Sequence, residues 1–143
     1  MIRFIREEFN GEQVMSVREV RERMQELYVY DLYGFRTEAK VLASVLYPHE
    51  VVNCFATGIH EGKRKMLVVT VYRIIVISTA FASSPDIITI PREEISHPMV
   101  VKRFFFSSIS FEVYSKEFLF TLVSQRVLDV FLWALEQPIP DRF

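Results

Sequence analysis

Cysteine, glycine and net charge are all scarce in this sequence of 143 residues, and each scarcity excludes something. Cys54 is the single cysteine, so an internal disulfide is impossible, which fits a reducing compartment. Among only four glycines there is no glycine-rich phosphate loop, and neither HExxH nor GxSxG occurs. The formal net charge of -1 gives no electrostatic reason to expect nucleic acid as a partner.

A long apolar run is also missing. The longest candidate, residues 66–82, is shorter than the ~20 residues of a membrane-spanning helix, and Arg73 lies near its middle. The first residues, "MIRFIREEFNGEQ", carry no apolar stretch or cleavage site typical of a secretory signal. We therefore expect a cytoplasmic protein, with peripheral attachment to a membrane as the alternative.

Apolar and aromatic residues are abundant, at 50% and 14%, which is ample for one folded core. In "MLVVTVYRIIVIS" most residues are β-branched, which favours strands over a helix. We predict two strands, Lys65–Thr70 and Ile74–Ser78, joined at a corner near "TVYR". The first of them should be buried on both faces, or nearly so.

Short strands at close spacing follow the same rhythm along the last two thirds of the chain. In "SISFEVYS", Ile109, Phe111 and Val113 alternate with polar residues and should face a core. The other predicted strands are "EVVNCFATG" ending at Gly58, "IITIP" stopped by Pro91, "MVVKRFFF" and "EFLFTLV". Roughly seven strands of this kind indicate a sandwich or a small barrel.

A helical period appears after Ser124, a plausible N-cap, and Pro138 ends it. Its apolar stripe predicts an amphipathic helix that plugs one end of the barrel. The stripe consists of Val127, Leu128, Phe131, Leu132 and Leu135. A second, short helix is predicted from Thr37 to Leu46.

The N-terminal third predicts a helix from Ser16 to about Tyr30, because Ser16 and Glu19 form a capping box. Its narrow apolar seam has the width of a two-helix contact. The seam consists of Val17, Val20, Met24 and Leu27. It can pack on the barrel, on a second copy of the chain or on another protein. Before Ser16, a hairpin around Asn10–Gly11 and a short helix both remain open.

Residues 36–136 resemble the bacterial pleckstrin-homology-like domains of the YokE type. Three motifs carry the resemblance: Leu46, Pro48 and Glu50; then Leu67–Ile77 with Thr70 and Arg73; then Ile90, Pro91 and Ile95. The resemblance implies a mainly β (α+β) fold, a bent seven-stranded antiparallel barrel or orthogonal sandwich capped by a C-terminal α-helix. It implies no enzyme, and we expect no cofactor. We expect an N-terminal helical extension at 1–35, the PH-like domain at 36–137 and a short tail at 138–143.

Arg73 would stand at the bend between two strands, where its head reaches solvent or carbonyl groups. We favour a structural role for it, holding the hairpin or pairing with a carboxylate. Cys54 alternates with apolar strand residues and should be a buried small hydrophobe rather than a nucleophile. His49, His60 and His97 should be solvated turn residues, since no pair has metal-ligand spacing on one element. We therefore expect neither a catalytic nor a metal site.

Two clusters are candidates for binding. Lys63, Arg64 and Lys65 are predicted in the loop between the first two barrel strands, where the resemblance implies that lipid-binding relatives hold basic residues. A solvated turn is the alternative. In "VKRFFF", an outward aromatic such as Phe105 beside Lys102 or Arg103 would be a protein contact or a membrane anchor, and burial under the N-terminal helices is equally open. The leading hypothesis is a non-enzymatic module that self-associates or docks a protein partner; weak binding of anionic lipid headgroups is the alternative.

Overall fold

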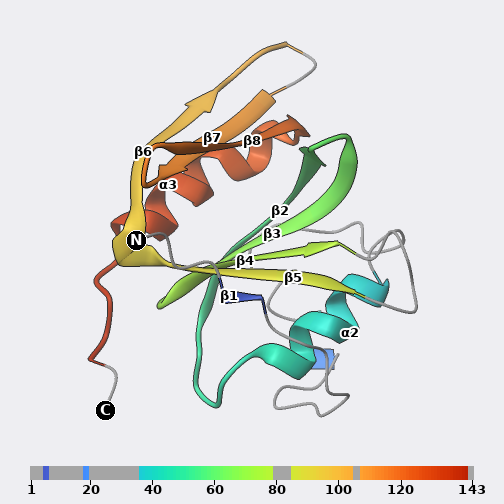
Figure 1. The fold of residues 1–143 in the computed structure, drawn as a ribbon, viewed down its shortest axis with the longest axis vertical. Coiled ribbons are helices and arrows are strands. Elements are labelled where there is room, and N and C mark those ends of the chain that lie inside the picture. Colours follow the sequence, from blue (N-terminus) through green and yellow to red (C-terminus); the bar gives the residue numbers. More distant parts are fainter. Residues whose placement is uncertain (1–4, 7–17, 20–35, 79–84, 105–106, 142–143) are drawn as a thin grey trace.

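One antiparallel sheet forms the body of the molecule (Figure 1). The computed structural model describes residues 5–6, 18–19, 36–78, 85–104 and 107–141. The strand order is β1-β5-β4-β3-β2-β8-β7-β6. The strands are β1 (Ile5–Arg6), β2 (Val52–His60), β3 (Lys63–Thr70), β4 (Arg73–Ser78), β5 (Asp86–Pro91), β6 (Ile95–Val101), β7 (Ser107–Val113) and β8 (Lys116–Val123). The seven predicted strands are confirmed as β2 to β8, and the two-residue β1 adds to the edge of β5.

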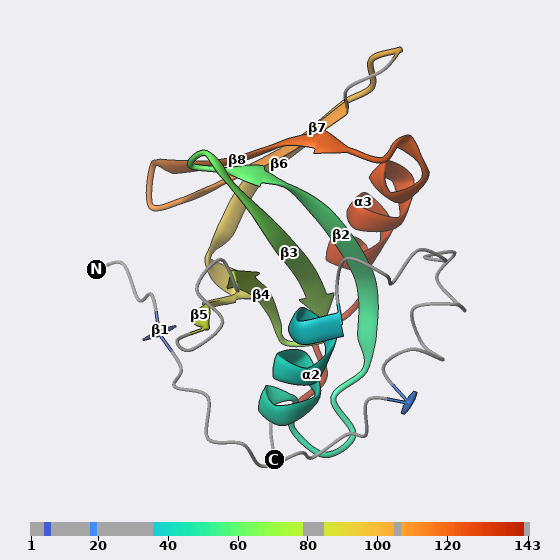
Figure 2. The same cartoon turned by 90° about the vertical axis from the view of Figure 1, so that its right-hand side faces the viewer.

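The sheet bends into two half-sheets, β2–β5 and β6–β8, which meet where β2 pairs with β8 at Ile59 and Thr121 (Figures 1 and 2). Gly58 allows this close approach, because a Cβ atom there would lie 2.8 Å from the Thr121 carbonyl oxygen. On the other side, the 3-10 helix η2 (Arg92–Glu94) turns the chain from β5 into β6. The bent, mainly β architecture that the resemblance implies is therefore confirmed.

The C-terminal helix α3 (Leu128–Glu136) lies against both half-sheets, as predicted. Val127, Leu128 and Phe131 of its stripe are buried, and Leu132 and Leu135 are half-buried against the same core. The Ser124 side chain does accept a hydrogen bond from a backbone N–H, but it caps the short 3-10 helix η3 (Gln125–Val127) that precedes α3.

Strand β4, and β3 from Lys65 onward, are buried on both faces, because each face meets a different helix. One face lines the barrel interior together with α3, and the opposite face lies under α2 (Arg36–Val45), the predicted short helix (Figure 2). The interior side chains are Leu67, Val69, Ile74 and Val76, and those in the α2 cluster are Met66, Val68, Ile75 and Ile77. This arrangement explains why the run of residues 66–78 has almost no polar position.

Three predicted boundaries were wrong. Strand β2 continues past Gly58 to His60, and β3 begins at Lys63, so the connection is only Glu61 and Gly62, both with positive φ. Strand β6 covers 95–101 instead of 99–106, because the chain leaves the ladder after Val101.

The predicted helix from Ser16 to Tyr30 lies outside the described residues, apart from Arg18 and Glu19, which are helical and exposed. The seam residues Val17, Val20, Met24 and Leu27 and the Asn10–Gly11 segment are likewise not described. In the part of the chain that the structure describes, no helix is long and apolar enough to cross a membrane.

Candidate functional site

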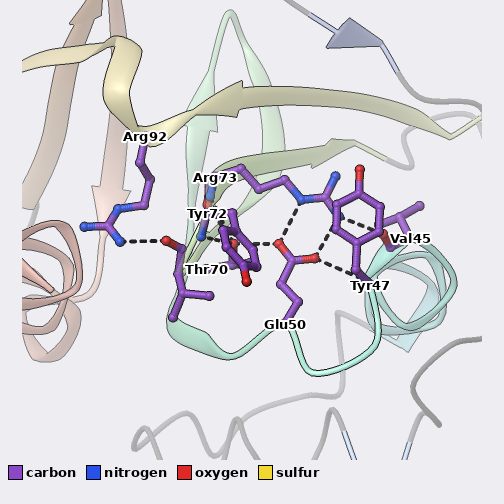
Figure 3. A network of polar contacts seen from close by, with 8 residues as sticks. Val45, Tyr47, Glu50, Thr70, Tyr72, Arg73 and Arg92 are labelled. Atoms are coloured by element: carbon purple, nitrogen blue, oxygen red, sulfur yellow. Dashed lines mark hydrogen bonds and ion pairs between the residues drawn. The ribbon is translucent and has the colours of Figure 1, made fainter. Parts of the chain in front are cut away.

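A buried ion pair occupies the corner between β3 and β4 (Figure 3). Arg73 donates from Nε to Glu50 Oε2 and from Nη2 to Glu50 Oε1, both at 2.9 Å, and from Nη2 to the Val45 carbonyl at 2.7 Å. The same carboxylate accepts from Thr70 Oγ1 at 2.7 Å and from the Tyr47 backbone N–H at 3.0 Å. The Tyr47 ring lies 4.2 Å from the Arg73 guanidinium carbon, a cation–π contact.

The Thr70 hydroxyl also shapes the corner itself. It accepts hydrogen bonds from the backbone N–H groups of Tyr72 and Arg73, both at 3.1 Å. This is the local side-chain-to-backbone pattern by which threonine favours a turn over a continuing strand. The motif residues Glu50, Thr70 and Arg73 therefore hold α2, the following loop and the hairpin together. Arg73 pairs with a carboxylate, one of the structural roles expected for it, and its head is buried rather than solvated.

Arg92 is a second buried arginine that sequence reasoning missed. It donates from Nη1 to the Val71 carbonyl at 2.9 Å and from Nη2 to the carbonyls of Leu135 and Gln137 at 2.8 and 2.6 Å. Carbonyls at a helix C-terminus have no partner within the helix, so a guanidinium there stabilises the end of α3. Burial lowers the Arg92 pKa, and the neighbouring Glu93 opposes that shift. Arg92 lies in the sequence "IPREEI", but nothing in that motif indicates a buried arginine. The carbonyl partners of Arg92 at the end of α3 lie 43 and 45 residues away in the chain.

A small pocket opens between the β2–β3 hairpin, the start of β5 and the start of β8, and we name it the barrel mouth. Its volume is about 220 Å³. Its lining residues are His60, Glu61, Lys65, Asp86, Ile88, Lys116 and Phe118. The predicted basic cluster is divided here: Lys63 and Arg64 are exposed on β3, whereas Lys65 is only 6% exposed and lines the pocket. Placing all three in a loop was therefore wrong, because β3 starts earlier than predicted.

His60 is buried rather than a solvated turn residue, which corrects a second expectation. It ends β2, and its ring stacks on Phe118 and Phe120 with centroids 5.5 and 4.8 Å apart. Its Nδ1 lies 3.0 Å from the Leu119 carbonyl oxygen. His49 and His97 are exposed, as predicted, but His97 lies on β6 rather than in a turn, with its Nδ1 2.6 Å from Glu112 Oε2.

The predicted cluster near residue 103 lies at the end of β6, which projects from the body in both views (Figures 1 and 2). Lys102, Arg103 and Phe104 are exposed, and Phe104 reaches 85%. The Gln125 side chain donates to the carbonyls of Arg103 and Phe104. Phe105 lies outside the described residues. The strand prediction failed for Lys102 to Phe104, because the chain leaves the ladder after Val101.

Exposed apolar side chains lie on the side of β6–β8 that faces away from the core. The cross-strand pairs Met99–Ser110 and Ser110–Leu119 place these three side chains in one row, opposite the buried Ile109 and Phe111. We name the outer sheet face as Met99, Ser110, Leu119, Thr121 and Leu122.

Leu122 reaches this face through a β-bulge. Thr121 and Leu122 together oppose Ser108, and Leu122 has φ +57°, in the left-handed region. A left-handed backbone conformation costs a non-glycine residue about 1–2 kcal/mol, so the conformation of Leu122 lowers the stability of the fold.

The comparison with protein families agrees with this geometry. The family model described as "Bacterial PH domain" matches residues 46–136. The chain belongs to the bacterial PH domain family. No curated protein matches the sequence significantly. The match begins at the loop after α2 and ends with α3, so helix α2, which was predicted inside the resemblance, precedes the matched part of this bacterial PH domain.

Reactive chemistry is sparse in the described part of this bacterial PH domain. Cys54 is fully buried, as predicted, and burial raises its thiol pKa to about 12, which opposes formation of the nucleophilic thiolate. Within the described ranges, no group of three His, Cys, Asp or Glu residues could hold a metal ion. The family to which it belongs consists of modules that generally bind proteins or lipids.

Proposed function

We propose that this bacterial PH domain is a non-enzymatic module that docks a protein through the outer sheet face. The observation that carries the proposal is the row of Met99 and Leu119 with the neighbouring Leu122, all exposed on one side of β6–β8. Scattered exposed apolar residues are ordinary, whereas a group of them on one sheet face is typical of an interaction site.

Backbone strain supports the same surface. The φ of Leu122 brings an apolar side chain to solvent at a cost to stability, and strained residues of this kind gather at functional positions. Ser110 and Thr121 of this face are small, so a partner can approach the sheet closely. The N-terminal seam of Val17, Val20, Met24 and Leu27 remains a proposed second contact, acting beside this face.

A matched pair of variants tests the outer sheet face. Leu119→Glu should abolish binding of proteins that co-purify with the chain from its native host, as measured by quantitative mass spectrometry. Ile139→Glu is the control, because Ile139 is 41% exposed against 42% for Leu119 but lies in the C-terminal tail. Equal recovery of the same proteins by both variants would show that the outer sheet face is not the docking surface. Deleting residues 1–35 tests the helical seam in the same assay.

A second candidate function is binding of an anionic headgroup at the barrel mouth. It is favoured by two lysines that line the pocket, Lys65, which is 6% exposed, and Lys116, which is exposed. An ammonium group can donate charge-assisted hydrogen bonds to the oxygen atoms of an anionic headgroup. Lys63 and Arg64 on the same strand would add attraction toward an anionic surface, so this candidate places the protein at the cytoplasmic side of a membrane.

Liposomes distinguish this candidate from protein docking. Vesicles of phosphatidylglycerol should sediment the protein at low salt, with less bound as salt rises. Lys65→Met should reduce the bound fraction more than Lys40→Met, a control at an exposed lysine on α2. If the protein stays in the supernatant at low salt, or if both variants bind equally, the barrel mouth does not hold a headgroup.

A further inference from the structure

Positive charge is concentrated where the chain leaves β6. Lys102 and Arg103 follow directly on this strand and are exposed, and Arg126 is exposed on η3. The described residues at this end of the half-sheet, 99–104, 107–110 and 121–127, include these three cations and no aspartate or glutamate. Since the whole chain has a net charge of -1, the local excess of positive charge does not follow from the composition.

An exposed aromatic ring follows these cations in the chain. Phe104 is 85% exposed, more than any other large apolar residue in the described ranges. Its backbone carbonyl and that of Arg103 accept hydrogen bonds from the Gln125 side chain of η3, and the Arg103 N–H donates to Ser107 Oγ at 3.4 Å. The backbone is therefore tied to both η3 and β7. We name Lys102, Arg103 and Phe104 the β6 extension.

The shape of this region favours a lipid surface over a folded protein as its partner. The end of β6 projects from the body in both views (Figures 1 and 2). A stable interface between two folded proteins buries about 800 Å² on each partner, and a projecting strand end offers only a fraction of that area. The headgroup layer of a bilayer closes around a projecting segment and accepts an aromatic side chain at headgroup level.

We infer that the β6 extension attaches this protein to an anionic membrane surface, with the Phe104 ring inserted among the lipid headgroups. Insertion removes the apolar surface of the ring from water, and Lys102 and Arg103 are attracted to the negative potential of the membrane. Arg126 adds to the same attraction. This attachment uses neither the outer sheet face nor the barrel mouth, because it consists of different residues.

Vesicle sedimentation with the full-length chain tests the attachment. At low salt the wild type should bind vesicles of phosphatidylglycerol and phosphatidylcholine, and it should not bind vesicles of phosphatidylcholine alone. Lys102→Gln/Arg103→Gln should lower the partition coefficient about thirtyfold, because each cation near an anionic surface contributes about fivefold. Phe104→Ser should lower it about tenfold, because the apolar burial of the ring is lost.

Two control variants match these changes outside β6–β8. Arg18→Gln/Lys40→Gln removes two exposed cations, and Ile139→Ser removes an exposed apolar side chain in the C-terminal tail. Both should bind the anionic vesicles nearly as well as the wild type, and circular dichroism of each variant verifies that the fold is retained. Equal sedimentation of the wild type and both β6-extension variants overturns the inference, as does a wild type that stays in the supernatant at low salt.

Tryptophan fluorescence reports insertion of the ring directly. Trp133 is the single tryptophan, so Trp133→Phe/Phe104→Trp moves the one indole to the β6 extension. Its emission should shift to shorter wavelength on anionic vesicles and should be quenched by lipids with brominated acyl chains. A vesicle-bound protein whose emission does not change attaches without inserting residue 104, which overturns the inference.

Two further outcomes assign membrane or partner binding to another cause and also overturn it. If Lys65→Met abolishes vesicle binding while the β6-extension variants keep it, the barrel mouth is the attachment site. If Phe104→Ser loses co-purifying host proteins but binds vesicles like the wild type, the β6 extension is a protein contact. Neither outcome affects docking on the outer sheet face, which is tested by Leu119→Glu.

Discussion

Replacing Glu50 by glutamine keeps the shape of a buried side chain and removes its charge. The carboxylate accepts four hydrogen bonds, two from the Arg73 guanidinium, one from the Thr70 hydroxyl and one from the Tyr47 backbone N–H. A glutamine amide has one oxygen and one NH₂ group. Whichever way it is turned, the NH₂ group faces two donors, and Arg73 is left buried without its counter-charge.

The expected loss of stability is large because Glu50 and Arg73 are almost completely buried, with 1% and 3% of their surface exposed. Removing one member of a buried ion pair costs about 3–5 kcal/mol of unfolding free energy. For a chain of this length each kcal/mol lowers Tm by about 2–4 °C, so Glu50→Gln should lower Tm by roughly 6–20 °C.

Thermal and urea denaturation followed by circular dichroism measure the effect. Glu136→Gln, at an exposed position on α3, is the control and should change stability by about 0.5 kcal/mol or less. The double variant Glu50→Gln/Arg73→Gln should be more stable than the sum of the two single losses predicts, because it removes the uncompensated charge. A Glu50→Gln loss under about 1 kcal/mol, or additive losses, would refute the account of this network.

Three further positions give distinct expectations. Arg92→Met should lower the unfolding free energy by about 2–4 kcal/mol, because three carbonyls lose a charged donor; a urea midpoint equal to that of the wild type would contradict this role. Gly58→Ala should lower Tm by about 3–10 °C, because its new Cβ meets the Thr121 carbonyl oxygen at 2.8 Å; an unchanged Tm would mean that β2 and β8 separate readily. The thiol of Cys54, with its pKa raised to about 12, should not react with Ellman's reagent at pH 8 until urea unfolds the protein. The unfolded thiol ionises at about pH 8.5. The contribution of the buried Cys54 thiol to the free energy of unfolding is therefore complete below that pH and is lost as pH rises toward 12. Cys54→Ala should abolish this dependence of stability on pH. Reaction of the native thiol at the unfolded rate would contradict its burial.

Local patterns were sufficient for most of the barrel. The β-branched run predicted β3 and β4, the alternation of Ile109, Phe111 and Val113 predicted the inner face of β7, and the apolar stripe after Ser124 predicted α3. These predictions succeeded because a strand or helix buried against a core must repeat apolar residues with its own period.

The candidate sites were harder to predict for the opposite reason. Lys65 and His60 look like loop residues in the sequence, and the structure buries both. Their burial depends on a connection of only two residues and on the neighbouring β8, which lies about sixty positions later in the chain. Likewise, nothing local to Arg92 indicates that its guanidinium reaches the end of α3.

The sequence by itself therefore determined the strand and helix periods, the turn chemistry at Thr70 and the family to which the chain is similar, because these depend on residues close together in the chain. Tertiary structure alone decided which sheet face α2 covers and which face of β6–β8 remains open. It also decided which cations enter the barrel mouth. The physical reason is that burial is a property of distant segments brought into contact, so an exposed Leu119 and a buried Leu67 are alike until the sheet bends.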